Sequence, residues 1–467
     1  MKIYTTIREE MMVGALLVLL GALTMPVHAD ALSASDIVER FCGSSEKILV
    51  TTFDDHEDAD GCTAEDCTLR EAVNAANLCP YGRPAMVQLR DGSYELKYVD
   101  YLYYFNPSGN YVRYAYEPDP HASPSFSIRG DIRIYGDRAT TIRPREGVEY
   151  GLLSSNAFVV AQGARLNLRK NLSIENFSYG VARVREGGYL TLNRVTLRNN
   201  RGGLASILTN RGDTRVVNST VAENRATDAS YIIANSGFMK ITSSTISGNH
   251  VTGSETINCI VANAGKMVLL ASTVSGNRYV RGAICADGDT RIVDSTIVNN
   301  TFTVAAELVG TTGAVSVDDR VVTALEISNT IIANNSPLDC AFPATGLPSA
   351  AHRAANLDSD GSCAAIPELD FRLSMDPVLE PLAYNKGPTQ THMPVLGSPV
   401  IDAGDACNSH DQRAQARPVD GDFDLASRCD MGAVEYVPDY GLYKEKLLNT
   451  DCPDPSGYNC ADTYPAK

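Results

Sequence analysis

The stretch GDTRIVDSTIVNN at residues 288–300 decides the fold, because closely similar stretches recur along the chain. Its six-residue ending is repeated as STISGN at 244–249 and as STVSGN at 272–277. The asparagines that end these motifs are spaced by 23 to 34 residues: Asn176, Asn200, Asn224, Asn249, Asn277, Asn300 and Asn334. Periods of this size indicate stacked units, as in a solenoid or a propeller.

A glycine marks the start of each repeated stretch. Five glycines lie 12 residues before their asparagines: Gly188, Gly212, Gly237, Gly265 and Gly288. The residues between the two markers are rich in Val, Ile and Thr and end in turn residues, which favours strands over helices. The sequence therefore predicts an all-β fold, a right-handed parallel β-helix of about eight or nine coils, with coils spaced by roughly 4.8 Å.

Positions within the repeat predict the role of individual side chains. The ninth residue after each glycine is apolar and is expected to form an inward stack: Leu197, Val221, Ile246, Val274 and Ile297. Asparagine at the end of the motif suits a turn, since it tolerates the left-handed conformation. Stacked asparagines can also hydrogen-bond along the rod. We therefore interpret the repeated asparagines as architecture and not as catalytic residues.

Composition and the N-terminus bear on location. The 467-residue chain carries a formal net charge of −16, which argues against a nucleic-acid partner. Lys2 and Arg8 precede an apolar run from Val13 to Met25, so residues 1–29 resemble a secretory signal peptide, with a membrane anchor as the alternative. The expected location is extracellular or at the cell surface, with no transmembrane segment in the mature chain.

All 12 cysteines follow the expected cleavage site, and an even number in an exported chain indicates disulfides. Short separations suggest four pairs: Cys62–Cys67, Cys340–Cys363, Cys407–Cys429 and Cys452–Cys460. Cys42–Cys79 and Cys259–Cys285 would then remain, and the members of the second pair are out of register in the repeat. Twelve cysteines permit many pairings, so the sequence alone does not choose among them.

Both regions that flank the repeats resemble known exported β-helix families. Residues 48–77 include CTLREA at 67–72 and resemble the CSLREA domain. Residues 376–436 include GPTQTH, SPVIDAGD and CDMGAVEY and resemble the choice-of-anchor Q domain. The resemblance implies a bacterial, exported β-helix protein. Apolar residues at helical spacing agree with a short helix over 68–78 that covers the first coil.

A rod of coils leaves two apolar ends that need caps, and this requirement divides the chain. The expected segments are 1–29 signal peptide, 30–47 linker, 48–97 N-terminal cap, 98–125 Tyr-rich insertion, 126–338 coils, 339–436 C-terminal capping region and 437–467 Cys-containing tail.

Three acidic stretches are candidate calcium sites, because Ca²⁺ takes six to eight oxygen ligands and such loops supply several at close range. The candidate ligands are Asn356, Asp358 and Asp360, then Asp420, Asp422 and Asp424, and finally Asp58 and Asp60. None of the stretches has the Glu of an EF-hand, and a solvated acidic turn is the alternative. Ca²⁺ is the one cofactor that the sequence suggests.

Two features are candidate ligand-binding surfaces. Residues 98–120 are rich in tyrosine, and the candidate binding residues are Tyr101, Tyr103, Tyr104 and Tyr111. Their rings can stack on sugars, or alternatively the segment can pack on the rod as an extra β-hairpin. Basic residues stand three after the marker glycines and form one outward row suited to an anionic polysaccharide: Arg215, Lys240 and Arg291. The alternative for this row is local ion pairing with Asp213 and Asp289.

The sequence favours a secreted or surface-associated scaffold that binds glycan or another surface without catalysis. A polysaccharide lyase or glycoside hydrolase is the first alternative, and a purely structural envelope protein is the second. A hydrolase needs two facing carboxylates. Asp213 and Asp289 are three coils apart, roughly 14 Å at the strand spacing, which is too far for such a pair.

Overall fold

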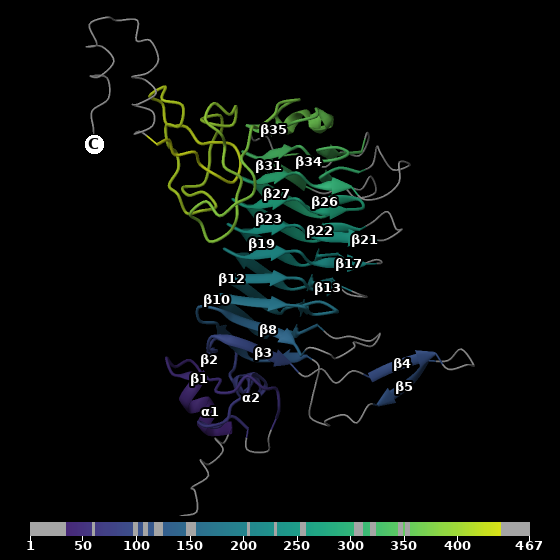
Figure 1. Cartoon of the computed structure of the whole chain (residues 1–467), viewed down its shortest axis with the longest axis vertical. Coiled ribbons are helices and arrows are strands. Elements are labelled where there is room, and N and C mark those ends of the chain that lie inside the picture. The colour runs from purple at the N-terminus through teal and green to yellow at the C-terminus, as the bar shows by residue number, and fades with distance from the viewer. Residues whose placement is uncertain are drawn as a thin grey trace, which may run out of the picture.

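The structure, a computed structural model, is a rod of stacked coils (Figure 1). It describes residues 34–57, 61–96, 101–105, 111–115, 125–145, 156–202, 206–227, 231–252, 258–302, 312–317, 324–343, 349–350 and 355–439. The expected signal peptide, Asp58, Asp60 and the tail cysteines Cys452 and Cys460 lie outside these residues. Among the described residues, no helix has the length and hydrophobicity to cross a membrane.

The strands of the coils form three parallel sheets, and five of the coils contribute to all three. In a typical coil, β15 (Asp213–Val217) and β16 (Thr220–Ala222) join a twenty-stranded sheet. β17 (Arg225–Thr227) then joins a five-stranded sheet, and β18 (Ile233–Asn235) joins a nine-stranded sheet. The nine-stranded sheet takes one strand from each coil. The prediction of a right-handed parallel β-helix with eight or nine coils is therefore confirmed.

The strands of these sheets have the following bounds. The twenty-stranded sheet contains, besides β15 and β16, β1 (Lys47–Leu49), β2 (Ala85–Gln88), β3 (Gly92–Leu96), β7 (Asp131–Tyr135), β8 (Thr140–Pro144), β10 (Arg165–Glu175), β12 (Tyr189–Arg198), β19 (Phe238–Thr242), β20 (Thr245–Ser247), β23 (Lys266–Leu270), β24 (Thr273–Ser275), β27 (Asp289–Val293), β28 (Thr296–Val298), β31 (Ala324–Ser328), β32 (Ile331–Ala333), β34 (Ser349–Ala350), β35 (Asn356–Asp358) and β36 (Phe371–Arg372). The nine-stranded sheet contains, besides β18, β6 (Phe126–Ile128), β9 (Phe158–Val160), β11 (Ala182–Val184), β14 (Leu208–Asn210), β22 (Cys259–Asn263), β26 (Gly282–Ala286), β30 (Val315–Ser316) and β33 (Cys340–Ala341). The five-stranded sheet contains, besides β17, β13 (Arg201–Gly202), β21 (His250–Thr252), β25 (Arg278–Tyr279) and β29 (Thr301–Phe302).

The predicted inward stack runs through the core of the rod. Leu197 pairs with Val221, Val221 with Ile246, and the series continues in register to Val274 and Ile297. All five side chains are buried. Because each coil repeats the same inward position, apolar contact continues along the whole axis and stabilises each coil against its neighbours.

An asparagine ladder follows one corner of the rod. Side-chain amides donate to the next side-chain oxygen at 2.9 to 3.0 Å through Asn200, Asn224, Asn249, Asn277, Asn300, Asn335 and finally Asp339. The prediction of the ladder is therefore wrong by one residue at each end. Asn176 and Asn334 occupy the turn position before the ladder, where φ is positive, and Phe177 and Asn335 take the ladder position itself. The left-handed turn and the ladder are thus adjacent positions and not one.

The marker glycines form a second column, and close packing explains them. A Cβ atom on Gly212, Gly237, Gly265 or Gly288 would lie 2.2 to 2.3 Å from the carbonyl oxygen of the preceding glycine in the column. Real Cβ atoms do not approach an oxygen so closely, so any side chain would push neighbouring coils apart.

The N-terminal cap is larger than predicted. The segment 30–47, expected to be a linker, contains α1 (Ala34–Phe41), whose Ile37 and Phe41 pack on the core. The predicted helix is present as α2 (Leu69–Ala76) and begins with a capping box between Thr68 and Glu71. Two short helices therefore cover the apolar end of the first coil.

The C-terminal region, residues 339–436, has two parts with different positions on the rod. Two short 3₁₀ helices, η2 (Ser362–Ala365) and η3 (Pro367–Leu369), bury Cys363 and Leu369 at the other end of the rod. Residues 376–436, here called the flank region, instead lie beside the upper coils along the twenty-stranded sheet (Figure 1). The expected end cap is therefore the short segment before the flank region.

Outward threonines of the upper coils hold the flank region in place. Thr245 donates to the carbonyl of Gln390 at 2.5 Å, and Thr273 donates to the Gln412 side chain at 2.6 Å. Thr296 accepts from the Ala433 amide at 2.9 Å. All three threonines are buried. One threonine column on the rod thus serves as a hydrogen-bonding strip for the flank region.

Five disulfides join the described cysteines. Cys62–Cys67, Cys340–Cys363 and Cys407–Cys429 have the pairing that short separations suggested. The remaining two are Cys42–Cys79 in the N-terminal cap and Cys259–Cys285 between neighbouring strands. The partners in the last pair lie on paired strands but not at directly opposite positions, which agrees with their mismatch in the repeat.

We expect Asn249→Ala to lower the free energy of unfolding by about 2–4 kcal/mol, because it leaves the buried Asn224 amide and Val221 carbonyl without their hydrogen-bond partner. Asn299→Gly is the matched control, since Asn299 is exposed and has φ of 59°. Denaturant unfolding of both variants measures the difference. Equal losses in the two variants would contradict the structural role of the ladder.

Acidification is expected to loosen the flank region through His392. Its Nδ1 lies 2.7 Å from the Glu380 carbonyl and its Nε2 lies 2.8 Å from the Ser275 hydroxyl. Burial lowers the pKa of His392, so the folded state holds the neutral ring. The stability that depends on this neutral ring is complete above the unfolded pKa of about 6.5 and decreases as pH falls below it.

The measurement is the melting temperature of the wild type and of His392→Gln across that pH range. The wild type should lose more on acidification than the variant. Buried acids such as Asp430, whose pKa burial and Glu435 raise to about 8, respond oppositely, since their stabilising effect is lost as pH rises. They are common to both proteins and cancel in the comparison. Parallel pH profiles would show that His392 is not the linked group.

Candidate functional site

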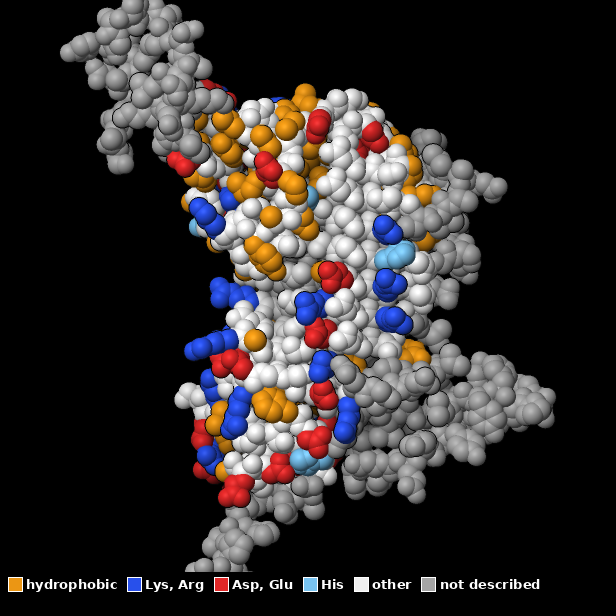
Figure 2. Space-filling model, in the orientation of Figure 1, with side chains coloured by type: hydrophobic (Ala, Val, Ile, Leu, Met, Phe, Trp, Pro, Cys, Tyr) orange, Lys and Arg blue, Asp and Glu red, His pale blue; other side chains and the backbone are white. Residues whose placement is uncertain are grey.

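A polar groove lies where the flank region ends and the lower coils become exposed. Figure 2 shows the surface hollowed below the flank region, with basic side chains beside the hollow. The groove has a volume of about 650 Å³ and is here called the flank groove. It is lined by Asn171, Ser173, Arg194, Val195, Thr196, Asn218, Thr220, Tyr384, Lys386, Pro388, Arg413 and Ala414.

The floor of the groove is the continuation of the threonine column. Ser173, Thr196 and Thr220 are in register on neighbouring strands, and Thr245, the next in the column, is already covered by the flank region. The hydroxyls that the flank region does not cover therefore face the groove. Strand pairing fixes their spacing at roughly 4.8 Å.

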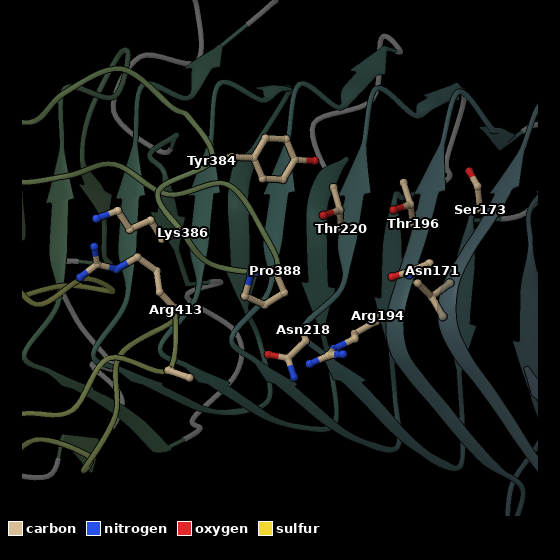
Figure 3. A pocket seen from close by; sticks show the side chains of 12 residues that line it. Asn171, Ser173, Arg194, Thr196, Asn218, Thr220, Tyr384, Lys386, Pro388 and Arg413 are labelled. Carbon is tan, nitrogen blue, oxygen red and sulfur yellow. The ribbon is translucent and has the colours of Figure 1, made fainter. Parts of the chain in front are cut away.

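A corner column forms one edge of the groove. Asn171, Arg194 and Asn218 have φ between 49° and 58° and lie at the bend between two consecutive strand segments of a coil. Asparagine adopts this left-handed conformation readily, whereas arginine does so at some cost. The bend presents these side chains beside the threonine floor (Figure 3).

The opposite wall comes from the flank region. Tyr384 is 69% exposed, and its ring extends from the flank region toward Thr220 and Thr196 (Figure 3). Lys386 and Arg413 lie behind it on the same wall. Arg413 is held by Asp411, with Nε 2.8 Å from Oδ2. An exposed aromatic ring thus faces a row of hydroxyl and amide groups.

The charge of the lining is positive. Arg194, Lys386 and Arg413 carry cationic groups, and the twelve lining residues contain no carboxylate and no imidazole. Of these three cations, Arg413 is ion-paired with Asp411, which is not among the lining residues. A further ion pair joins Arg198 and Glu175, with Nε 2.7 Å from Oε2, on the strands of the groove floor. The groove therefore combines an apolar ring, neutral hydrogen-bonding groups and positive charge on an acidic protein.

The Tyr-rich insertion forms a hairpin, as one of the two interpretations of the sequence expected. β4 (Tyr101–Phe105) pairs with β5 (Tyr111–Ala115) in antiparallel register. This two-stranded sheet pairs with none of the three sheets of the rod in the described residues. The side chains of Tyr101, Tyr103, Tyr104 and Tyr111 lie outside what the structure describes, so their ligand-binding role stays a prediction.

The predicted basic row exists, but acids neutralise much of it. Arg215, Lys240 and Arg291 are aligned with Val268 between the last two. Arg215 lies 3.5 Å from Asp213, and Arg291 lies 3.2 Å from Glu326 on the next coil. The partner of Arg291 is thus Glu326 and not Asp289. Local ion pairing, the alternative weighed for this row, accounts for two of its three cations.

The calcium candidates are in two different situations. Asp358 accepts from the amides of Cys363 and Ser374, Asp360 accepts from Ser362, and the Asn356 side-chain oxygen accepts from the Thr330 amide. These groups therefore order the turns of the last coil. Burial raises the pKa of Asp358.

Asp420 and Asp422 are brought together with Asp402, which sequence reasoning missed because it lies 18 residues earlier. One carboxylate oxygen of each lies within 4.8 Å of the others. Burial raises the pKa of Asp402, and the nearby Asp422 raises it further. The backbone hydrogen bonds that Asp402 accepts lower the pKa but do not outweigh burial. Asp424 instead pairs with Arg428 at 3.1 Å.

Comparison with known proteins adds little to these observations. No family model matches the chain, so the resemblance to CSLREA and choice-of-anchor Q domains stays a prediction. No curated protein matches it either. Among solved structures it is similar to the crystal structure of pectate lyase Pel9A, with 13% identity and a TM-score of 0.42 over 86% of this chain and 100% of that chain. The fold rests on the strand pairings of this chain, and a likeness of this degree carries no argument about its chemistry.

Proposed function

We propose that this β-helix is a glycan-binding scaffold that holds a sugar chain in the flank groove without cleaving it. The observation that carries the proposal is the exposed ring of Tyr384 facing the hydroxyls of Thr196 and Thr220. Secretion to the cell surface, which the N-terminal sequence predicts, would give such a groove access to glycans.

The groove offers both kinds of contact that a sugar needs. A pyranose ring has an apolar face of C–H groups, which stacks on an aromatic ring, and an edge of hydroxyls, which need hydrogen-bond partners. Tyr384 supplies the first contact, and Thr220 and Asn218 supply the second. The row of Ser173, Thr196 and Thr220 repeats these partners along the rod, so an extended chain suits the groove better than a single sugar.

The lining supports binding over cleavage. A glycoside hydrolase needs a pair of carboxyl groups that flank the scissile bond. A β-helix lyase with calcium also needs carboxylate ligands beside the basic residue. The residues that line the flank groove supply no carboxylate for either purpose.

The first test is a glycan-array screen of the chain with and without EDTA, followed by product analysis on every hit. We expect retention without bond cleavage. Tyr384→Ala should weaken the affinity for a hit by about tenfold, since an aromatic contact of this kind contributes about 0.5–1.5 kcal/mol beyond the area that it buries. Tyr384→Phe should bind as the wild type does.

Tyr81→Ala is the matched control, because Tyr81 is 55% exposed at the other end of the rod. Its affinity should not change. Equal loss of affinity in both alanine variants would show that exposed tyrosines bind the glycan nonspecifically and that the flank groove is not the binding site. Release of unsaturated or reducing sugars from any hit would overturn the proposal in favour of an enzyme.

We also propose that Asp402, Asp420 and Asp422 bind Ca²⁺. Each carboxylate already accepts backbone amides, but an oxygen with two lone pairs can accept one N–H and also contact a cation. Ca²⁺ should raise the melting temperature, and Asp420→Asn combined with Asp422→Asn should remove that rise. Asp358→Asn is the control and should keep it. An equal response of all proteins to Ca²⁺ would exclude this site.

A further inference from the structure

A column of basic side chains runs along the five-stranded sheet, on a different sheet from the strands that line the flank groove. Arg201 pairs with Arg225, Arg225 with His250, and His250 with Arg278, each on the first residue of its strand. The three arginines are exposed and His250 is half-buried. These four residues are here called the basic column, and Figure 2 shows them as aligned blue and pale blue side chains on the rod.

The asparagine ladder fixes the position of the column. Each member follows a ladder asparagine directly, and its amide donates to the ladder carbonyl of the preceding coil. Arg225 donates to Asn200, His250 to Asn224 and Arg278 to Asn249, all at 2.8 Å. The four side chains therefore leave the rod from a rigid backbone at equal spacing of roughly 4.8 Å.

The charge of the column is not balanced within the described part of the chain. Arg201, Arg225 and Arg278 form no ion pair with any described acid, whereas Arg215 and Arg291 on the twenty-stranded sheet both do. Like charges that face each other on neighbouring strands destabilise a sheet. On a chain with 56 acidic and 40 basic residues, four aligned cationic or ionisable side chains without described acids point to a counter-charge from outside.

We propose that the basic column binds a linear acidic polysaccharide that carries one carboxylate or sulfate on each sugar and lies parallel to the axis of the rod. In such a polymer each ring with its glycosidic oxygen advances the chain by a length similar to the strand spacing, so successive anions meet successive coils. Duplex DNA places one charge per about 3.4 Å on each strand, which does not match this spacing.

His250 makes this binding sensitive to pH. Burial, and then the neighbouring Arg278 and Arg225, lower the pKa of His250, and no described acid faces it on either neighbouring strand. The exposed Glu223 lies on the turn before Arg225, beside Gly248, which is two residues before His250. A bound anion favours the protonated ring, so the column gains its fourth charge as pH falls.

The test measures binding of alginate oligomers, which have a carboxylate on every sugar, against hyaluronan oligomers, which have one on every second sugar. Alginate should bind more tightly, and its affinity should fall with rising salt. Arg225→Gln combined with Arg278→Gln should weaken alginate binding by about tenfold and make the salt dependence shallower. Arg129→Gln combined with Arg138→Gln changes the net charge equally at two exposed arginines of the first coils and should bind as the wild type does.

Two further variants keep the proposal falsifiable if the double variant folds poorly. His250→Arg should tighten alginate binding near pH 7.5, and His250→Gln should remove the increase in affinity on acidification. Loss of alginate binding in Tyr384→Ala, with wild-type binding in the Arg225 and Arg278 double variant, would place alginate in the flank groove and overturn this proposal, so failure at the flank groove and failure at the column are distinguishable. Equal losses in both double variants, no preference for alginate over hyaluronan, or equally tight binding of single-stranded oligothymidylate would overturn the proposal.

Discussion

In-register stacking of parallel coils is the constraint on which the rest of this structure depends. Each coil repeats the conformation of the one below it, so residues at equivalent positions become columns along the rod. Identical or similar side chains in a column must therefore be able to pack or hydrogen-bond with one another. Apolar residues satisfy this condition in the core, asparagines satisfy it by donating to one another, and glycines satisfy it where two backbones leave no space for a Cβ atom.

The flank region breaks this symmetry along the rod. The same outward threonine column is covered over the upper coils and open over the lower ones, so the boundary of the cover creates a groove on an otherwise uniform surface. Thr245 lies under the cover, and Thr220 lies just beyond it. A function that needs two different walls therefore arises where an irregular segment meets a regular one.

The spacing of the repeat was enough to predict the fold, because a periodic sequence fixes a periodic structure. It predicted the inward stack and the basic row in the correct register, but it placed Asn334 in the ladder because adjacent asparagines cannot be ranked by spacing alone. The spacing of the repeat could not predict the flank groove, since Tyr384 and Thr220 are 164 residues apart. They lie close together only because flank residues outside the repeat, such as Gln390 and Gln412, bond to the rod. The basic column could have been found, because each of its members directly follows a ladder asparagine.

The basic column also shows why net charge is a weak guide to a repeat protein. At physiological ionic strength the Debye length is about 8 Å, so acids farther than this from the column are largely screened. Successive members of the column lie roughly one strand spacing apart, which is within that length. A polyanion close to Arg225 and Arg278 would therefore experience their combined field before it experienced the net negative charge of the whole chain. On a rod of stacked coils, the local column and not the overall composition determines which charge can bind.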